Sequence, residues 1–416
     1  MNKASVTMEL AHPVTVAGIG AGGWDGLPPA TRAAITAATV LVGSDRQLAL
    51  IPAGLVADGP ATRIPWPTPL VPAIPGILAE HRDETICVLA SGDPTCYGIG
   101  STLVRLLGPG QVRVLPHPSS VSLARARLGW RADRTAVTSL VGQPTETLHP
   151  LVQPGRQILV LSPGSATPAQ IAALLCARGY GPSHLTVLEQ LGGPAERQLT
   201  GTATHWDHPD VDPLHVVAVD CVPEPGAPLL PTTPGLPDTA YDTDGQLTKR
   251  EIRVITLAAL APVPGQLLWD VGAGSGSIAI EWMRTHPTCQ AIAIERDPTR
   301  SARIAANAAA LGVPALRVVT APAPAALAGL PAPDAIFVGG GATTPGLLHD
   351  TWHALRPGGR LVATAVTLET EQALASRYAE LGGELTRIAV SRAAPVGGFT
   401  GWRPAMPVTQ WAVTKP

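Results

Sequence analysis

Charged and aromatic side chains are scarce in this sequence. Asp, Glu, Lys and Arg make up 14% of the 416 residues, Phe, Trp and Tyr make up 4%, and the formal net charge is −2. A typical soluble protein has about 25% charged residues. Binding to a nucleic-acid duplex depends on a basic surface that neutralises phosphates. The charge balance therefore argues against a protein that acts on DNA or RNA.

Cysteine is also rare, with five residues that never form a Cys-x-x-Cys pair. This number and spacing argue against a disulfide framework and against a structural zinc site, and they favour a reducing cytoplasm. His205, His208 and His215 lie close together in the sequence, but a fourth ligand at a standard spacing is missing. We therefore expect no metal site.

Long apolar runs are missing as well. Residues 1–12 carry Lys3, Glu9 and His12 and offer no apolar core for a signal peptide. The most apolar long stretch, residues 321–342, is interrupted by four prolines and by Asp334. We expect a cytoplasmic protein without a membrane-spanning segment.

Short β-branched runs alternate with Ala-rich stretches along the whole chain, which predicts parallel sheets covered by helices. Six prolines between Val222 and Thr239 predict an extended linker. We therefore expect one domain over residues 1–221, a linker over 222–240 and a second domain over 241–416.

The strands expected in the first domain are residues 14–19, 40–43, 85–91, 112–116, 158–162, 185–189 and 214–220. Those expected in the second domain are residues 267–271, 291–295, 316–320, 335–338, 360–365, a segment near 386–391, and 407–414. Only a loop separates the last two strands, which is too short for a parallel crossover. The final strand is therefore predicted to be antiparallel.

A glycine-rich loop stands between a buried strand and a helix in the second domain. Asp270 lies in the strand, glycines follow at 272, 274 and 276, and the helix covers residues 278–284. Glycines at these positions let the backbone turn sharply and approach a ligand closely. A dinucleotide fingerprint would need glycine where Ser277 stands. The Asp-x-Gly-x-Gly-x-Gly form instead resembles motif I of the class I S-adenosylmethionine-dependent methyltransferases, and Glu295 ends the next strand, where a carboxylate can bind ribose hydroxyls.

Two further segments of the second domain bear on this loop. Thr248 and Glu251 have the spacing of a capping box that opens a helix over residues 249–260. The segment is either a simple helix start or a hydroxyl and two cations near a cofactor, and both interpretations stay open. Residues 339–341 are three glycines where enzymes that methylate DNA bases carry an Asn/Asp-Pro-Pro-Tyr type motif, so base methylation is not expected.

The first domain has three loops that follow strands and precede helices or turns. Gly18, Gly20 and Gly23 match Gly-x-Gly-x-x-Gly, but no helix is expected to start directly beneath them. The other two loops are centred on residues 91–94 and 116–120. Loops at the carboxyl ends of neighbouring strands are where an open α/β sheet binds its ligand. Together the three loops resemble the signature set of the class III, tetrapyrrole-type methyltransferases.

Residues 14–221 and 241–414 together resemble one family, the bifunctional decarboxylating precorrin C5,15-methyltransferases of cobalamin biosynthesis; residues 189–197 add to the resemblance. It implies an α/β protein with an N-terminal class III tetrapyrrole-methylase fold of two α/β subdomains. A C-terminal class I Rossmann-like methyltransferase fold with an antiparallel last strand would follow. The implied reaction is methylation of precorrin-6B from S-adenosylmethionine at C5 by the first half and at C15 by the second. The second half would also remove the ring C acetate carboxyl, which gives precorrin-8.

The resemblance also implies site residues. The cofactor-binding residues it implies are Ala21, Ser91, Gly92, Asp93, Ser119, Ser120, Thr248, Asp270, Gly272, Ala273, Gly274, Ser275, Gly276, Glu295 and Ala323. Ala21 stands where family members often have proline, and the segment around Ala323 lacks the acid that many class I enzymes place near adenine. No catalytic side chain is assigned, because in-line methyl transfer depends mainly on proximity and alignment.

The substrate is a flat ring fringed with carboxylates, so guanidinium groups are expected around it. The candidates are Arg250, Trp402 and Arg403, although residues 397–403 also suit a structural hairpin loop. The family resemblance further implies a homo-oligomer. Three alternatives stay open: a nicotinamide-dependent oxidoreductase that uses residues 18–23, an RNA methyltransferase with an accessory domain, and a non-catalytic module that senses S-adenosylmethionine.

Overall fold

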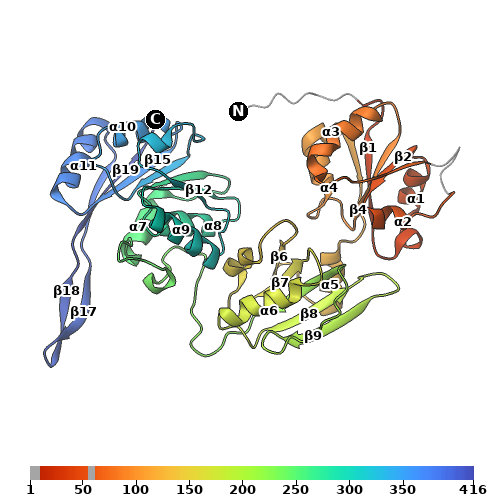
Figure 1. Cartoon of the computed structure of the whole chain (residues 1–416), viewed down its shortest axis with the longest axis horizontal. Helices are drawn as coiled ribbons and strands as arrows, with labels where there is room; N and C mark the ends of the chain where they lie inside the picture. Colours follow the sequence, from red (N-terminus) through yellow and green to blue (C-terminus); the bar gives the residue numbers. More distant parts are fainter. Residues whose placement is uncertain (1–9, 55–60) are drawn as a thin grey trace. The chain divides into compact units, whose positions relative to one another are not determined.

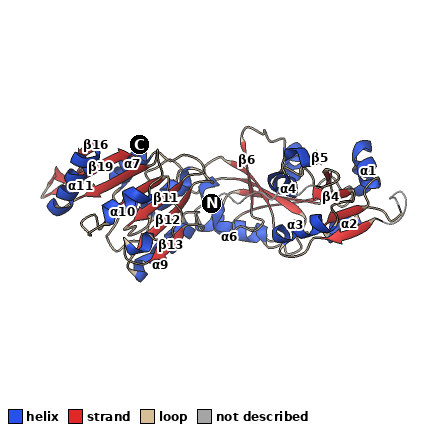
Figure 2. Cartoon of the chain, turned by 90° about the horizontal axis from the view of Figure 1, so that it is seen from above, coloured by secondary structure: helices blue, strands red, loops and turns tan. Residues whose placement is uncertain are grey.

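The computed structural model describes residues 10–54 and 61–416, so part of the 1–12 segment considered for a signal peptide lies outside the described residues. The chain divides into two compact units. The N-terminal unit comprises Met1–Gln143 and Pro154–Ala227, and the C-terminal unit comprises Pro144–Gln153 and Pro228–Pro416. Each unit is an α/β structure in which helices cover sheets (Figures 1 and 2).

The N-terminal unit begins with a five-stranded sheet in which every pairing is parallel. Its strand order is β3-β2-β4-β1-β5. The strands are β1 (Val14–Ile19), β2 (Val40–Gly43), β3 (Thr62–Pro65), β4 (Ile86–Ser91) and β5 (Val112–Leu115), and the helices are α1 (Pro29–Thr36), α2 (Asp45–Ala49), α3 (Leu70–Glu80) and α4 (Ile99–Leu107). The interior strand β1 is an apolar run that is buried nearly throughout, as expected where both faces of a parallel sheet are covered.

A second five-stranded sheet, of order β6-β7-β10-β8-β9, completes this unit. Only β6 and β7 pair in parallel. The elements are β6 (Thr135–Ser139), β7 (Gln157–Leu161), β8 (His184–Glu189), β9 (Arg197–Thr202), β10 (His215–Asp220), α5 (Ser120–Leu128) and α6 (Thr167–Ala177). The hydroxyl of Ser119 caps α5 by accepting the Ser122 N–H. The two sheets confirm the expected pair of α/β subdomains.

The C-terminal unit is built on one seven-stranded sheet of order β13-β12-β11-β14-β15-β19-β16. Its elements are α7 (Arg250–Leu260), β11 (Leu267–Val271), α8 (Ser277–Thr285), β12 (Gln290–Glu295), α9 (Pro298–Ala310), β13 (Arg317–Thr320), β14 (Ala335–Val338), α10 (Leu347–Ala354), β15 (Arg360–Ala365), α11 (Leu368–Leu381), β16 (Glu384–Ile388) and β19 (Val408–Thr414). The strands β11 to β15 are parallel, and β19 runs antiparallel to both of its neighbours. The prediction of an antiparallel last strand is confirmed.

Side chains on the two faces of this sheet form two separate cores. Leu268 and the alternate residues on its face pack against α7, α8 and α9. Trp269 and the alternate residues on its face pack against α10 and α11. The period of two along each strand therefore places three helices on one face and two on the other.

A hairpin stands between β16 and β19, where the sequence predicted only a loop. Its strands β17 (Ser391–Val396) and β18 (Phe399–Pro404) pair only with each other and project from the C-terminal unit (Figure 1). Phe399 is 85% exposed and Trp402 is 77% exposed. Residues 397–403 form the turn and most of β18 in this hairpin.

The proline-rich segment is only partly an extended connection. Leu230 and Leu236 are buried in the C-terminal unit. The buried carboxylate of Glu281 accepts the backbone N–H groups of Gly235 (2.6 Å) and Leu236 (3.1 Å). Residues 228–240 therefore pack onto the C-terminal unit, because their leucines find a core and their free N–H groups find a buried acceptor.

Among the described residues, the structure has no helix with the length and hydropathy needed to cross a membrane.

Candidate cofactor and substrate sites

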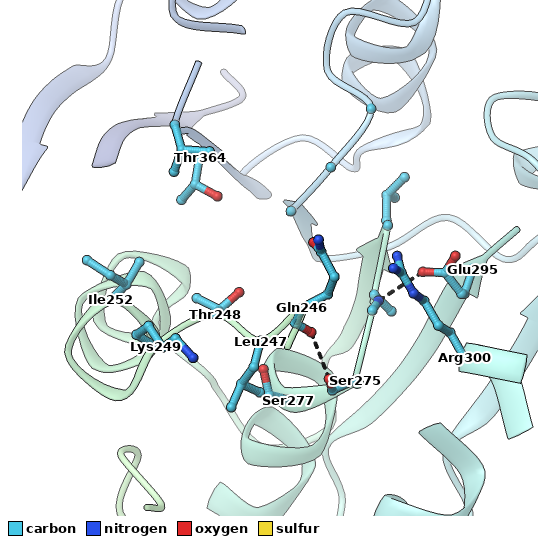
Figure 3. A pocket seen from close by; sticks show the side chains of 18 of the residues that line it. Gln246, Leu247, Thr248, Lys249, Ile252, Ser275, Ser277, Glu295, Arg300 and Thr364 are labelled. Atoms are coloured by element: carbon cyan, nitrogen blue, oxygen red, sulfur yellow. Dashed lines mark hydrogen bonds between the residues drawn. The ribbon is translucent and has the colours of Figure 1, made fainter. Parts of the chain in front are cut away.

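The larger cavity lies at the carboxyl ends of β11, β12 and β14 and has a volume of about 800 Å³. The strand order reverses here, because β11 has β12 on one side and β14 on the other. Ligands of open α/β sheets bind at such a reversal. Figure 3 shows the cavity, with Thr364 on one side and Glu295 and Arg300 on the other.

The glycine loop after β11 forms the floor of this cavity. Gly272, Gly274 and Gly276 have φ values of +72°, +59° and +76°, which residues other than glycine rarely adopt. A Cβ atom on Gly272 would lie 3.0 Å from the backbone N and O atoms of Gly340. The loops after β11 and β14 therefore touch each other, and glycine is required at their contact.

Glu295 ends β12 and stands beside this loop. Its side chain is 5% exposed, and one carboxylate oxygen accepts the Gly274 N–H at 2.9 Å while the other accepts the Asp297 N–H at 3.1 Å. A carboxylate has about four acceptor positions. These bonds orient Glu295 at the cavity wall and leave it able to accept hydrogen bonds from ligand hydroxyls.

The segment before α7 closes over the glycine loop. The Ser275 hydroxyl donates to the Gln246 carbonyl at 2.8 Å (Figure 3). The Asn307 amide donates to the carbonyls of Ser275 (3.1 Å) and Asp242 (2.9 Å). These bonds place Thr248 at the cavity wall, as expected if this segment supplies a hydroxyl near a cofactor.

The predicted capping box in this segment is wrong. The helix α7 begins at Arg250, and its N-cap is Lys249, which makes no side-chain cap bond. Thr248 lies outside the helix, and Glu251 forms an ion pair with Arg392. The Thr-x-x-Glu spacing is displaced by one residue from the position that a capping box needs.

Asp270 lies beneath the glycine loop. It is 1% exposed, one carboxylate oxygen accepts the Ala279 N–H of α8 at 3.0 Å, and the other has no hydrogen-bond partner among the described residues. Burial raises the pKa of Asp270 to about 7. This carboxyl group therefore ties the end of β11 to the start of α8.

The smaller cavity lies in the N-terminal unit, between loops of its two sheets, and has a volume of about 90 Å³. A Cβ on Gly18 would lie 2.1 Å from the Gly92 carbonyl oxygen, and one on Gly20 would lie 2.7 Å from the His117 ring. The three predicted loops of the first sheet therefore contact one another. Leu188, Leu191, Leu214 and His215 line the cavity from the second sheet.

Ser91 provides a polar anchor in this cavity. Its hydroxyl oxygen accepts a hydrogen bond from the Arg46 guanidinium at 2.9 Å and one from the Gln47 amide at 3.0 Å. Burial lowers the pKa of Arg46, which also lines the cavity. Helix α2 of the first subdomain therefore contributes a cation beside the glycine loops.

The structure brings most of the predicted cofactor residues to the two cavities. Those that line a cavity are Ala21, Ser91, Gly92, Ser120, Thr248, Gly272, Ala273, Gly274, Ser275, Glu295 and Ala323. The others lie next to the lining residues: Asp93 accepts bonds from Thr95, Ser119 caps α5, and Asp270 and Gly276 lie at the junction of the glycine loop with β11 and α8.

The three substrate candidates are placed differently. Arg250, Trp402 and Arg403 are not among the described residues that line the larger cavity. The cations that line it are Lys249, Arg296, Arg300 and Arg392. Arg392 lies at the base of the hairpin, which the sequence pattern did not predict as paired strands.

Several other lining residues were missed from the sequence. In the smaller cavity these include Arg46, Leu188, Leu191, Leu214 and His215. β10 runs antiparallel to β8, so His215 at the start of β10 pairs with Glu189 at the end of β8. Leu188 could be predicted from the rule that ligands bind at the carboxyl ends of strands. His215 lies at the amino end of β10, so it could be predicted only from the antiparallel direction of that strand.

The strand order, the antiparallel last strand and the glycine loop define the C-terminal unit as a class I methyltransferase fold. The two α/β sheets and three loops of the N-terminal unit have the arrangement of a tetrapyrrole methylase. Family models agree: one described as tetrapyrrole (corrin/porphyrin) methylases matches residues 13–207, and one described as a precorrin methyltransferase domain matches residues 239–415.

Curated relatives narrow the assignment. A precorrin-6Y C(5,15)-methyltransferase [decarboxylating] of Mycobacterium tuberculosis is 51% identical over 97% of this chain and 100% of its own. Two proteins of Salmonella typhimurium match smaller parts. A cobalt-precorrin-7 C(5)-methyltransferase is 33% identical over 46% of this chain and 89% of its own. A cobalt-precorrin-6B C(15)-methyltransferase (decarboxylating) is 30% identical over 41% of this chain and 89% of its own.

The chain therefore belongs to the family of decarboxylating precorrin-6Y C5,15-methyltransferases of cobalamin biosynthesis. It is a C-methyltransferase that also decarboxylates, and the resemblance described from its sequence is confirmed.

Proposed function

We propose that the chain carries two methylation sites, each using S-adenosylmethionine, and that its substrate is precorrin-6B. The N-terminal site methylates C5. The C-terminal site methylates C15 and removes the ring C acetate carboxyl, which gives precorrin-8. The observation that carries this proposal is the presence of two separate cavities, each formed where glycine loops follow parallel strands.

The domain boundaries follow the same division. We assign residues 1–221 to the C5 site, residues 222–240 to the connection and residues 241–416 to the C15 and decarboxylation site. Support comes from the two Salmonella typhimurium relatives, which are named for single-carbon activities and each match less than half of this chain.

The residues of the larger cavity fit S-adenosylmethionine. The glycine loop, whose positive φ values glycine adopts readily, would hold the amino acid part against bare backbone, and Glu295 would accept bonds from the ribose hydroxyls. The cavity segment 321–324 carries no charged side chain, so adenine would be recognised there through backbone groups. In the smaller cavity, the corresponding loops contain Ala21, Ser91, Gly92 and Ser120, with Asp93 and Ser119 beside them.

The chemistry requires orientation more than reactive side chains. When bound, the cofactor supplies an electrophilic methyl group on a sulfonium. The protein then has to align this group with the ring carbon and exclude water, which by itself contributes much of the rate enhancement. Lys249 and Arg392 at the rim of the larger cavity would bind carboxylates of the ring.

Two further features belong to the proposal. Val396, Phe399 and Trp402 expose apolar surface on the hairpin, which supports a homo-oligomer. None of the described cysteines forms a disulfide bond, and three of them are buried, which supports a cytoplasmic location.

The proposal is tested by calorimetric titration of the full chain with S-adenosylhomocysteine, read for stoichiometry before affinity. We expect two sites per chain. One site would mean that one cavity has another ligand. Absence of binding, together with binding of a nicotinamide dinucleotide in a parallel titration, would favour an oxidoreductase and overturn the proposal.

A further inference from the structure

His215 is a buried polar side chain in the wall of the N-terminal cavity. It is 6% exposed and lines the cavity together with Gly20, Ser91 and Leu214. Its Nε2 atom is buried and has no hydrogen-bond partner among the described residues. A buried polar atom without a partner costs free energy unless a ligand satisfies it.

The contacts of the ring define what Nε2 can bind. The other ring nitrogen, Nδ1, lies 2.6 Å from the backbone carbonyl oxygen of Asp212. A carbonyl oxygen only accepts, so Nδ1 carries the hydrogen. Burial lowers the pKa of His215, which keeps the ring neutral. Nε2 is therefore an acceptor with a free lone pair.

The position of the ring is fixed by a network on the neighbouring strands. The Glu189 carboxylate accepts the Asp212 N–H at 2.8 Å and the Arg197 guanidinium at 2.5 Å. The Asp212 carboxylate accepts the Leu214 N–H at 2.7 Å and the Gln190 amide at 3.0 Å. Asp212, whose carbonyl orients His215, is therefore held from three sides, and the acceptor is pre-organised.

The surroundings of Nε2 indicate the ligand group. Leu188, Leu191, Leu214 and Val216 make this end of the cavity apolar, while the glycine loops and Ser91 stand at the other end. An apolar wall with one acceptor suits a flat, uncharged heteroaromatic ring that carries an N–H donor.

We propose that His215 Nε2 accepts a hydrogen bond from the adenine amino group of the cofactor in the N-terminal site and so selects adenine there. This inference rests on the proposed function, because it requires an adenosyl cofactor in this cavity. It assigns His215 as a specificity-determining residue for the first site alone.

The test compares S-adenosylhomocysteine with S-inosylhomocysteine, in which a carbonyl oxygen replaces the adenine amino group. Titrations use the full chain in a Gly274→Arg background, so that only the N-terminal site is read. We expect the parent to bind the adenosyl compound about tenfold more tightly than the inosyl compound, because the carbonyl would face the Nε2 lone pair.

Two variants locate the effect. His215→Leu should abolish the preference for the adenosyl compound. His215→Gln, which places an amide oxygen near the position of Nε2, should restore much of it. His184→Leu, an exposed histidine at the opposite end of β8, is the matched control and should keep the full preference.

The outcomes separate this inference from the proposed function. If neither compound binds the N-terminal site of the parent, the proposed function fails at that site. If both compounds bind and His215→Leu keeps the full preference, the site stands and the role of His215 is wrong. A variant with unchanged preference and a raised KM for precorrin at C5 would place His215 against the tetrapyrrole and would also overturn the inference.

Discussion

The two cavities use loops of the same kind in different frameworks. The larger one lies at the edge of a single sheet, where Gly272 and Gly340 meet across the reversal of strand order. The smaller one draws its walls from two sheets, with glycine loops on one side and the start of β10 on the other. In both sites, glycines let two loops approach each other closely, but the polar side chains around the two sites are different.

The charged groups held directly at the glycine loops differ in sign as well as in source. The larger cavity has Glu295 directly on the glycine loop, held by the Gly274 N–H. The smaller cavity has Arg46 and Gln47 bound to Ser91, and the neutral ring of His215 opposite. The two cavities share no lining residue, so single substitutions should affect the two proposed activities separately.

The largest separation is expected from Gly274→Arg. Gly274 has φ +59°, and its N–H is bonded to Glu295, so an arginine there strains the loop and fills the cavity. C15 methylation and decarboxylation should be abolished while C5 methylation continues, as measured by mass spectrometry of the tetrapyrrole products. Gly358→Arg, at an exposed glycine with φ +75° where an added Cβ would meet no atom within 4 Å, is the control and should keep both activities. A folded Gly274→Arg variant that loses both methylations would contradict separate sites.

Asp93→Ala should produce the opposite pattern. The carboxylate of Asp93 accepts the Thr95 N–H at 2.8 Å and the Thr95 hydroxyl at 2.7 Å, which fixes the loop next to the smaller cavity. Loss of this orientation should reduce C5 methylation about 100-fold and leave C15 methylation unchanged. Asp83→Ala, an exposed aspartate before β4, serves as the control. Equal losses at both carbons would remove the basis for assigning the loop to the first site.

Glu295→Gln should have a smaller effect, confined to the larger cavity. The glutamine side chain lacks the negative charge and has one acceptor oxygen fewer than the carboxylate. A hydrogen bond to a charged group contributes about 1.5–3 kcal/mol. Calorimetry with S-adenosylhomocysteine should show one site weakened about tenfold or more and one unchanged. Glu384→Gln, on the exposed strand β16, should leave both sites unchanged. Two unchanged sites in Glu295→Gln would show that the carboxylate does not contact the ligand.

The last expected effect is on stability and not on activity: a pH dependence in the C-terminal unit. Asp270 has a pKa of about 7 in the folded chain because it is buried, against an ordinary value of 3.8. Between these two values the unfolded chain binds fewer protons, so stability falls as pH rises, by at most about 1.4 kcal/mol per pH unit.

Asp270→Asn should flatten this dependence between pH 4 and about 7. Hydrogen exchange of peptides that cover β11 and α8 measures it locally. Asp350→Asn, at an exposed residue of α10, is the control and should keep the slope of the parent. A parent protein without any slope in this range would show that Asp270 is ionised in the folded state.

The fold was largely predictable because most strands are apolar runs. The predicted boundaries of β1, β2, β11, β14 and β15 agree with the structure residue for residue. The missed strands β3, β6 and β9 all lie at sheet edges, where one side is unpaired and fewer side chains are buried. Edge strands such as Arg197–Thr202 therefore lack the apolar signal on which the prediction depends.

Site residues could be predicted where a local sequence pattern determines their position. They could not be predicted where folding brings together residues that are far apart in the sequence. Gly272 and Glu295 follow directly from a strand–loop–helix pattern. Arg392 reaches the larger cavity only because β17 starts beside it, and His215 reaches the smaller one only because β10 runs antiparallel to β8. No local spacing encodes such contacts, since they depend on strand direction and sheet order.

The hairpin β17–β18 has a consequence for how this family can diversify. Ile388 and Val408 pair directly across β16 and β19, so the sheet closes at that point whatever lies between them in the chain. A Cβ atom added to Gly397 or Gly398 at the tip would meet no atom within 4 Å. Lengthening a loop whose ends are already fixed costs little free energy. The arm can therefore change in length and sequence among relatives without a matching change in the sheet or the cofactor cavity.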